Sequence, residues 1–373
     1  MQKILFLIGS LGGGGAERAT INIAKIWAER GCDVVIATLD AEEPRIYDLP
    51  CGIRLVPLGI SGRSHGVINA LKNNVYRIRR LRNLLITERP DIAFGMMSAA
   101  VMLGIVRTRN MIAVGAERAF PPQSIPRGAW QFLRRLVYAR LDIVTVQTEV
   151  GRDWLLRHTR ARNVVVIPNS VEIPLAKQAP ELPVSLYVPS GQKLLLGAGR
   201  LVHQKAFDRL VVAFGRLAKK HPDWILAITG EGNDRESLER MVVDRGLGER
   251  VVLPGRAGNL ADWFMAAHAF VLTSRHEGFP NVLVEALAHG CPAVSVDCDT
   301  GPRDIIRHEE NGLLVSQDDP EALVAALDRI MSDDSLRGKM AANAPEVKTT
   351  FSPERISAMW QSLFVGTLGR PEK

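Results

Sequence analysis

The chain has 373 residues, which is enough for two domains of ordinary size. Hydrophobic residues make up 46% and charged residues 23% of it, which excludes a disordered chain, a collagen-like fibre and a polytopic membrane protein. The four cysteines show neither CxxC nor CxxH spacing, so a disulfide framework or structural zinc site is not expected and a reducing compartment fits best.

The positive charge is concentrated in the first half of the chain. Residues 1–170 hold 24 lysines and arginines against 13 acidic residues, whereas residues 171–373 hold 23 against 27. The formal net charge of +7 therefore arises in the first half, and it indicates an anionic partner for that half.

The N-terminal residues predict a buried strand. Only five apolar residues, 4–8, follow Met1-Gln2-Lys3, which is too few for the core of a signal peptide. The longest uncharged apolar stretch, 92–106, has 15 residues, below the roughly 20 that span a bilayer. We expect a buried strand and a buried helix there.

Short apolar runs then alternate with segments of helical period. In the first half we expect strands at 4–8, 34–39, 91–95, 111–115, 143–147 and 164–168, and a first helix over 16–30. In the second half we expect strands at 193–197, 224–229, 251–254, 269–272 and 293–296. This βαβα alternation predicts an α/β fold in which parallel sheets carry helices on both faces.

A proline-rich stretch interrupts the alternation and divides the chain. We predict two doubly wound, Rossmann-like domains, 1–175 and 193–350, joined by a linker over 176–192 and facing a central cleft. Residues 351–373 carry apolar side chains at helical spacing, and we expect them to form a C-terminal helix that crosses back to the first domain.

A glycine-rich turn, residues 12–15, lies between the first strand and the first helix. Its glycines allow a ligand to approach the backbone, and the helix start offers free N–H groups. The spacing does not fit GxGxxG, so a nicotinamide site is only weakly indicated. A turn that binds nothing remains the alternative.

Two motifs in the second half combine glycines with charged residues. Arg200 and Lys205 follow a strand beside a glycine-rich turn, an arrangement that suits a diphosphate. Glu277 and Glu285 flank the start of a helix over 282–289, where a phosphate can bind and where carboxylates accept hydrogen bonds from sugar hydroxyls. Alternatively, Glu277 caps the helix and Glu285 lies on a solvated face, and the residues alone leave both open.

The sequence Glu-Gly-Phe-Pro-Asn-Val-Leu-Val-Glu-Ala at 277–286 resembles the signature of glycosyltransferase family 4, retaining enzymes that use nucleotide sugars and have the two-domain GT-B fold. Further segments agree in order: Gly-Gly-Ala-Glu-Arg at 14–18, Ile-Pro-Asn-Ser-Val at 167–171, Gly-Arg-Leu at 199–201, Gly-Glu-Gly at 230–232 and Asn-Gly-Leu-Leu-Val at 311–315. The resemblance runs from about residue 3 to about residue 365 and is close to bacterial enzymes that build surface or capsular polysaccharide on lipid-linked intermediates.

The resemblance implies roles for the matching residues. Arg200 and Lys205 hold the donor diphosphate, and Glu277 contacts the donor hexose. Glu285 binds the nucleotide ribose, and Arg256 lies where the uracil base is held. The other donor-binding residues that it implies are Gly13, Gly14, Gly15, Gly278, Phe279, Pro280, Asn281, Val282 and Leu283.

The acceptor side is less defined. Many relatives carry a histidine near the anomeric centre, where this chain reads Gly-Ala-Glu-Arg-Ala-Phe-Pro, so Glu117 or Arg118 is expected in its place and no general base is assigned. Retention of the anomeric configuration is expected without a covalent intermediate.

Asp297-Cys-Asp299 resembles a metal-binding DxD, but the resembled fold normally needs no metal, so neither a metal nor another cofactor is expected.

Residues 71–90 contain six lysines and arginines against one glutamate, with apolar residues at helical spacing. Such a basic amphipathic helix suits an anionic membrane surface, although a solvated helix face is the alternative. A second basic and aromatic segment lies at 127–140. We therefore expect a cytoplasmic protein that contacts the inner membrane surface peripherally.

Together these features predict a retaining transferase that moves a hexose or N-acetylhexosamine from a UDP-sugar to a polyprenyl-pyrophosphate oligosaccharide. The alternatives are a UDP-sugar epimerase or a phosphorylase of the same architecture, and a non-enzymatic protein that binds polyanions or membranes. Against the last stands the placement of Arg200, Lys205 and Glu277 in the acidic half. No aromatic stacking pattern accompanies the basic stretch, so a nucleic-acid partner is not expected.

Overall fold

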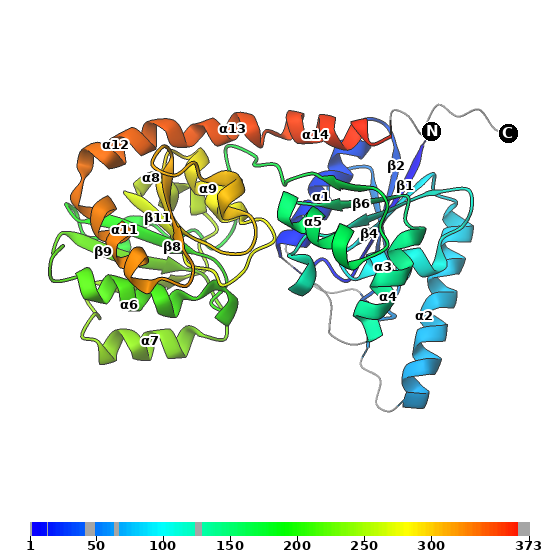
Figure 1. The fold of residues 1–373 in the computed structure, drawn as a ribbon, viewed down its shortest axis with the longest axis horizontal. Helices are drawn as coiled ribbons and strands as arrows, with labels where there is room; N and C mark the ends of the chain where they lie inside the picture. Colours follow the sequence, from blue (N-terminus) through cyan, green and yellow to red (C-terminus); the bar gives the residue numbers. More distant parts are fainter. Residues whose placement is uncertain (1, 13, 42–48, 63–66, 124–128, 365–373) are drawn as a thin grey trace. The chain divides into compact units, whose positions relative to one another are not determined.

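A computed structural model describes the chain outside residues 1, 13, 42–48, 63–66, 124–128 and 365–373. The chain forms two compact α/β units (Figure 1). Unit 1 comprises Met1–Pro168 together with Ser357–Lys373, and unit 2 comprises Asn169–Ile356. Among the described residues, no helix has both the length and the apolar character needed to cross a membrane.

Unit 1 is built on a seven-stranded parallel sheet with the order β3-β2-β1-β4-β5-β6-β7. Its strands are β1 (Lys3–Ile8), β2 (Asp33–Thr38), β3 (Ile53–Pro57), β4 (Ile92–Met96), β5 (Ile112–Ala116), β6 (Ile143–Val146) and β7 (Val164–Val166). The inner strands are almost wholly buried, as expected for a parallel sheet that helices cover on both faces. The strand order reverses between β1 and β4.

Five helices follow these strands in unit 1, and a sixth joins them from the end of the chain. They are α1 (Gly15–Ala28), α2 (Val67–Glu88), α3 (Ala99–Val106), α4 (Ala129–Val137), α5 (Glu149–His158) and α14 (Pro353–Ser362), with short 3-10 turns at Pro121–Gln123 and Tyr138–Arg140. Helix α3 is largely buried, and both α2 and α4 pack against it.

The last turns of α14 belong to unit 1. The rings of Trp360 and Phe364 both meet the ring of Phe94 on β4 edge to face, and Phe364 also meets Trp27 of α1 in this way. All four side chains are at most 5% exposed. Trp360 and Phe364 thus fill part of the core of unit 1.

Unit 2 repeats the architecture with a six-stranded parallel sheet of order β10-β9-β8-β11-β12-β13, which reverses between β8 and β11. Its strands are β8 (Lys193–Ala198), β9 (Trp224–Thr229), β10 (Val251–Gly255), β11 (Ala269–Leu272), β12 (Ala293–Asp297) and β13 (Gly312–Ser316). Its helices are α6 (Phe207–Leu217), α7 (Arg235–Asp244), α8 (Leu260–Ala266), α9 (Asn281–Ala288), α10 (Pro302–Ile305), α11 (Pro320–Ser332), α12 (Asp334–Asn343) and α13 (Val347–Thr350). Its 3-10 turns are Val184–Leu186, His203–Lys205 and Ala344–Glu346.

The fold class expected from the sequence is confirmed, and each expected strand is found with its ends within two residues. Two further strands, β3 and β13, were not expected. They lie at the outer edges of their sheets, where half-exposed residues replace a continuous apolar run. The strand expected at 293–296, which ends beside Asp297, is therefore not the last one in the chain, because β13 follows it.

The expected linker, 176–192, is ordered on unit 2. The Asn259 side chain accepts from the Leu182 backbone N–H at 2.8 Å and donates to the Leu182 carbonyl at 3.1 Å. The Trp263 indole donates to the same carbonyl at 3.0 Å, and the Gln178 N–H donates to the Gly258 carbonyl at 3.0 Å. The division between the units therefore falls at Pro168–Asn169, earlier than the expected boundary at 175.

Candidate active site

The motifs of the second half meet at the carboxyl edge of the sheet in unit 2. Arg200 lies just after β8, and Glu277 lies in the loop after β11. These two strands flank the reversal of strand order, which is where open α/β sheets bind their ligands. Arg256 follows β10 at the same edge.

Lys205 and Glu277 form an ion pair at this edge. The Lys205 Nζ lies 2.6 Å from Glu277 Oε1, and the Ser274 hydroxyl donates to the same oxygen at 2.5 Å. The side chains of Lys205 and Glu277 are only 14% and 7% exposed. Two donors thus fix one carboxylate oxygen, while Oε2 has no hydrogen-bond partner among the described residues.

Further bonds join the turn that carries Lys205 to the loop that carries Glu277. The Thr273 hydroxyl donates to the Lys205 carbonyl at 3.0 Å, and the Gln204 amide donates to the His276 carbonyl at 2.9 Å. The Thr300 hydroxyl donates to the Glu277 carbonyl. Ala206, next to Lys205, has a φ of +53°, a left-handed conformation that costs a non-glycine residue about 1–3 kcal/mol and is concentrated at functional sites.

The start of α9 presents backbone donors beside Glu277. Pro280 occupies the N-cap position, and no side chain caps the helix. The N–H groups of Gly278, Phe279 and Val282 have no backbone or side-chain acceptor among the described residues. Such N–H groups at a helix start attract an anion, because they are unsatisfied and lie at the positive end of the helix dipole.

Arg200 is an exposed cation on a fixed loop. Its side chain makes no hydrogen bond or ion pair with any residue that the structure describes. The loop itself is held because the Leu201 N–H donates to the Glu231 carbonyl at 2.8 Å. Gly230 packs so closely that an added Cβ would lie 1.8 Å from the Gly199 carbonyl oxygen. The Gly-Glu-Gly segment therefore supports the loop that presents Arg200.

Glu285 and Arg256 are placed differently from each other. Glu285 is 4% exposed within α9, so the alternative of a solvated face is wrong for this residue. Arg256 is exposed, and its Nη2 donates to Gln178 Oε1 at 3.3 Å.

Asn281 accepts a hydrogen bond from the Asn169 amide at 2.8 Å through its Oδ1. Its partner belongs to the Ile-Pro-Asn-Ser-Val segment.

The remaining donor-side residues lie in unit 1 or around α9. Gly14 is the N-cap of α1 and Gly15 its first residue, whereas Gly13 lies outside the described residues. Phe279, Pro280 and Leu283 are buried, and Phe279 packs edge to face on Phe351. Their side chains support the start of α9, and of their backbone N–H groups only that of Phe279 has no acceptor among the described residues.

The structure corrects the expectation for Glu117 and Arg118, which are 0% and 6% exposed. Glu117 Oε1 accepts from the Tyr138 hydroxyl at 2.5 Å and lies 3.5 Å from Arg134 Nη1. Arg118 donates to the Ile167 carbonyl at 3.0 Å and to the Thr145 hydroxyl at 3.1 Å, and burial lowers its pKa to about 9. Both side chains hold the interior of unit 1 together, and we do not retain them as acceptor-side residues.

Sequence reasoning missed two residues that orient Glu277. Ser274 stands three positions before it in the same loop after β11, close enough along the chain for its hydroxyl to reach the carboxylate. Thr300 comes from the loop after β12 and gave no signal in the sequence.

Asp297 of the DxD segment accepts from Arg303 Nε at 2.9 Å. Among the described residues, no cluster of three or more potential metal ligands is found.

Two family models match the chain. One, described as "Glycosyl transferase 4-like domain", matches residues 14–170, and the other, "Glycosyl transferases group 1", matches residues 179–347. The chain belongs to glycosyltransferase family 4. The two matched regions correspond closely to units 1 and 2.

Similar proteins have been described in bacteria. A *Campylobacter jejuni* protein, 26% identical over 97% of this chain and 98% of its own length, is named "GalNAc-alpha-(1->4)-GalNAc-alpha-(1->3)-diNAcBac-PP-undecaprenol alpha-1,4-N-acetyl-D-galactosaminyltransferase". Sucrose-phosphate synthase from *Thermosynechococcus elongatus* has a similar fold, with a TM-score of 0.82, 20% identity and 99% of each chain covered. *Anabaena* HepE in complex with UDP reaches 0.76 at 19% identity, over 98% of this chain and 100% of its own. The fold of this glycosyltransferase is accordingly GT-B.

Proposed function

We propose that this glycosyltransferase moves a hexose or N-acetylhexosamine, with retention, from a UDP-sugar to a lipid-linked saccharide in bacterial polysaccharide synthesis. The observation that carries the proposal is the site at the β8–β11 reversal. There Arg200 and three N–H groups, all without a partner among the described residues, share one sheet edge with the Lys205–Glu277 pair. The name of the *Campylobacter* relative, which includes an undecaprenol-linked saccharide, supports the acceptor class.

The donor diphosphate fits the positive groups of the site. Arg200 is free to pair with phosphate oxygens, and the N–H groups of Gly278, Phe279 and Val282 lie at the start of α9. When the anomeric bond breaks, negative charge develops on the departing diphosphate. Cations and N–H groups fixed in advance stabilise that charge without reorganising, which lowers the barrier to transfer. That HepE is described in complex with UDP supports uridine as the donor base.

The two glutamates fit the hydroxyl groups of the donor. Glu277 keeps Oε2 for a sugar hydroxyl because Ser274 and Lys205 already hold Oε1. Glu285 is proposed to accept from the ribose, and Arg256 to lie near the base. No side chain of this site is assigned as a general base. The departing phosphate is proposed to take the acceptor proton, which accounts for retention without a covalent intermediate.

Contact with a membrane surface is the second part of the proposal. On α2 the side chains of Tyr76 and Ile86 are 54% and 51% exposed, and Phe132 of α4 is 61% exposed. Arg79, Arg80 and Arg82 are exposed on α2 as well. Exposed apolar and basic side chains on neighbouring helices suit the headgroup region of an anionic bilayer, where a polyprenyl-linked acceptor is found.

Thermal unfolding with UDP, GDP or NAD tests the donor site. A ligand that binds only the folded protein stabilises it by about 2.7 kcal/mol at a hundred times its Kd. We expect UDP to raise the unfolding temperature, and Arg200→Ala to remove most of that rise. Arg240→Ala, an exposed arginine on α7, is the matched control and should keep it. No response to any of the three nucleotides would contradict the proposal, and a response to GDP alone would contradict its uridine part.

A panel of UDP-sugars then separates the transferase from the alternatives. The proposed enzyme consumes its donor only with an acceptor, and NMR of the product shows an anomeric configuration that matches the donor. Conversion of the UDP-sugar without an acceptor would indicate an epimerase. Dependence on inorganic phosphate would indicate a phosphorylase.

A further inference from the structure

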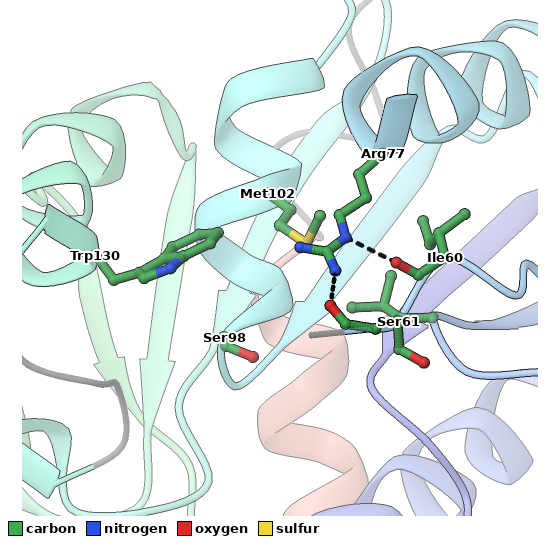
Figure 2. A pocket seen from close by; sticks show the side chains of 8 residues that line it. Ile60, Ser61, Arg77, Ser98, Met102 and Trp130 are labelled. Atoms are coloured by element: carbon green, nitrogen blue, oxygen red, sulfur yellow. Dashed lines mark hydrogen bonds between the residues drawn. The ribbon is translucent and has the colours of Figure 1, made fainter. Parts of the chain in front are cut away.

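Unit 1 contains a pocket of about 260 Å³. Its wall is mainly apolar, with a few polar groups, which is the usual composition of a small-molecule site. Among the residues that line it are Ile60, Ser61, Arg77, Ser98, Met102 and Trp130 (Figure 2). The volume lies just below the roughly 300–1,000 Å³ of sites for drug-sized ligands, so the pocket suits a ligand of about one sugar ring.

The pocket lies where a sheet of this kind binds ligands. Leu39, which also lines it, directly follows β2, and Ser98 follows β4 and is the N-cap of α3. These strands lie on either side of β1, at the carboxyl edge beside the reversal of strand order in unit 1. The corresponding edge of unit 2 carries the proposed donor site.

Arg77 brings a positive charge to the pocket that no carboxylate of the described residues offsets. Its Nε donates to the Ile60 carbonyl at 2.7 Å, its Nη2 to the Gly62 carbonyl at 2.5 Å and its Nη1 to Asn74 Oδ1 at 3.2 Å. A guanidinium has five N–H groups, so two remain for a ligand. The three bonds fix its orientation, and its partners are all neutral, so the full charge remains available to an anion.

Trp130 supplies a flat apolar surface across the pocket from this charge. Figure 2 shows its indole on one side and the Arg77 guanidinium on the other, with Ser98 at the edge between them. The Ser98 hydroxyl does not cap α3 and makes no hydrogen bond with any residue that the structure describes, so it is available to a ligand. An aromatic face beside a hydroxyl and a cation matches a sugar ring that carries an anionic group.

We propose that this pocket binds an anionic monosaccharide unit, one that bears a phosphate or a carboxylate, as part of the acceptor. This inference rests on the proposed function, since it names the class of acceptor for that reaction. Trp130 packs on the apolar face of the ring, the free N–H groups of Arg77 bind the anion, and Ser98 bonds to a hydroxyl.

Isothermal titration of the whole protein with three small probes tests the pocket. The probes are glucose 1-phosphate, glucuronate and methyl glucoside, each titrated with and without saturating UDP to keep the donor site occupied. We expect at least one anionic probe to bind about tenfold or more tightly than the neutral glycoside, because a hydrogen bond to a charged group is worth about that factor. The better anion identifies the source of the charge. Equal binding of all three probes, or binding of none, overturns the proposal.

Two variants place the binding in this pocket. Arg77→Gln removes the charge but also weakens the contacts with Ile60 and Gly62. Ser98→Asp adds a carboxylate at a helix start, where it favours the fold, and it repels an anionic ligand. Both should weaken binding of the anionic probe about tenfold, whereas Lys72→Gln, an exposed change on the same helix, should not. Unchanged binding in Ser98→Asp, or an equal loss in Lys72→Gln, overturns the proposal.

The test distinguishes this inference from the proposed function. The same preparations are titrated with UDP alone. Binding of UDP without any preference for the anionic probes rejects the pocket and leaves the donor site standing. Binding of an anionic probe that Ser98→Asp abolishes, without any binding of UDP, supports the pocket and rejects the proposed donor.

Discussion

Glu277 shows how a single carboxylate is prepared for a ligand. Ser274 and Lys205 approach the same oxygen at 2.5 and 2.6 Å, so the side chain loses its rotational freedom before any ligand arrives. Ser274 is wholly buried, and its hydroxyl donates to the Glu277 carboxylate. Its proposed role is therefore to position Glu277.

Replacing Ser274 by alanine tests this role. The loss of a hydrogen bond to a charged group costs about 1.5–3 kcal/mol, so we expect kcat with the active UDP-sugar to fall about tenfold or more. The Kd for UDP should not change, because UDP has no sugar for Glu277 to contact. Ser237→Ala, an exposed serine on α7, serves as the control. A variant that loses UDP affinity in proportion to kcat would show that Ser274 supports the fold of the whole site.

At the scale of single residues, the sequence was informative where the chemistry is local. Glu277 and the start of α9 lie within five residues, so the sequence pattern itself predicted this part of the site. Glu117 shows the opposite case. Its partners Tyr138 and Arg134 lie about twenty positions further along the chain, and nothing local indicated that they would bury it.

At the scale of elements, α2 carries arginines with different surroundings on different sides. Arg77 turns inward to the pocket, where it binds the carbonyls of Ile60 and Gly62. Arg79, Arg80 and Arg82 are exposed, and so is Tyr76. The basic residues of 71–90, which the sequence predicted as one surface, are thus divided between the pocket, where Arg77 lies, and an exposed outer face.

The outer face predicts binding to anionic lipid. Replacing Arg79, Arg80 and Arg82 by glutamine should lower the binding constant for phosphatidylserine vesicles by up to about 100-fold, since each basic residue near the surface contributes about 1 kcal/mol. Sedimentation with the vesicles measures this constant. Added salt should weaken binding of the unmodified protein in the same direction.

The control changes three exposed basic residues of unit 2, Lys219, Arg240 and Arg245, to glutamine. It removes the same charge, so it should leave vesicle binding nearly as it is. Equal loss in both triple variants would mean that net charge alone drives the association and that α2 has no particular part in it.

The strands at the edges of the two sheets are difficult to predict from the sequence pattern. The inner strands appear in the sequence as continuous apolar runs, because helices cover both faces of the sheet. In β3, by contrast, Arg54 and Pro57 are exposed, so the segment resembles a loop. Residues 176–192, expected as a linker, are held on unit 2 by hydrogen bonds of their backbone with the Asn259 side chain and the Gly258 carbonyl, and such bonds leave no periodic pattern in the sequence.

For the whole molecule, the most consequential contact is that of α14 with the core of unit 1. Trp360 is 1% exposed, meets Phe94 at 5.7 Å between ring centroids, and lies under the Arg118 guanidinium at 5.0 Å. It therefore both fills the core and faces a buried cation. Trp360 and Phe364, which come late in the sequence, are therefore part of the core of unit 1.

Trp360→Ala should cost about 3–5 kcal/mol of unfolding free energy, because it opens a large cavity in the core. Urea unfolding measures the loss, and hydrogen exchange should place it on the amides of unit 1 while those of unit 2 keep their protection. Ser362→Ala, an exposed change on the same helix, should alter stability by less than about 0.5 kcal/mol. A loss below about 1 kcal/mol for Trp360→Ala would contradict the packing described.

This arrangement also bears on how the protein is made. A ribosome releases the strands of unit 1 first, but Trp360 and Phe364, which cover Phe94 and Trp27, emerge only after all of unit 2. At about 5–20 residues per second, the roughly 190 residues between Pro168 and Ser357 take on the order of 10–40 s to synthesise. During that interval the first unit presents an open aromatic face to the cell, and a chain cut short before α14 would never close it.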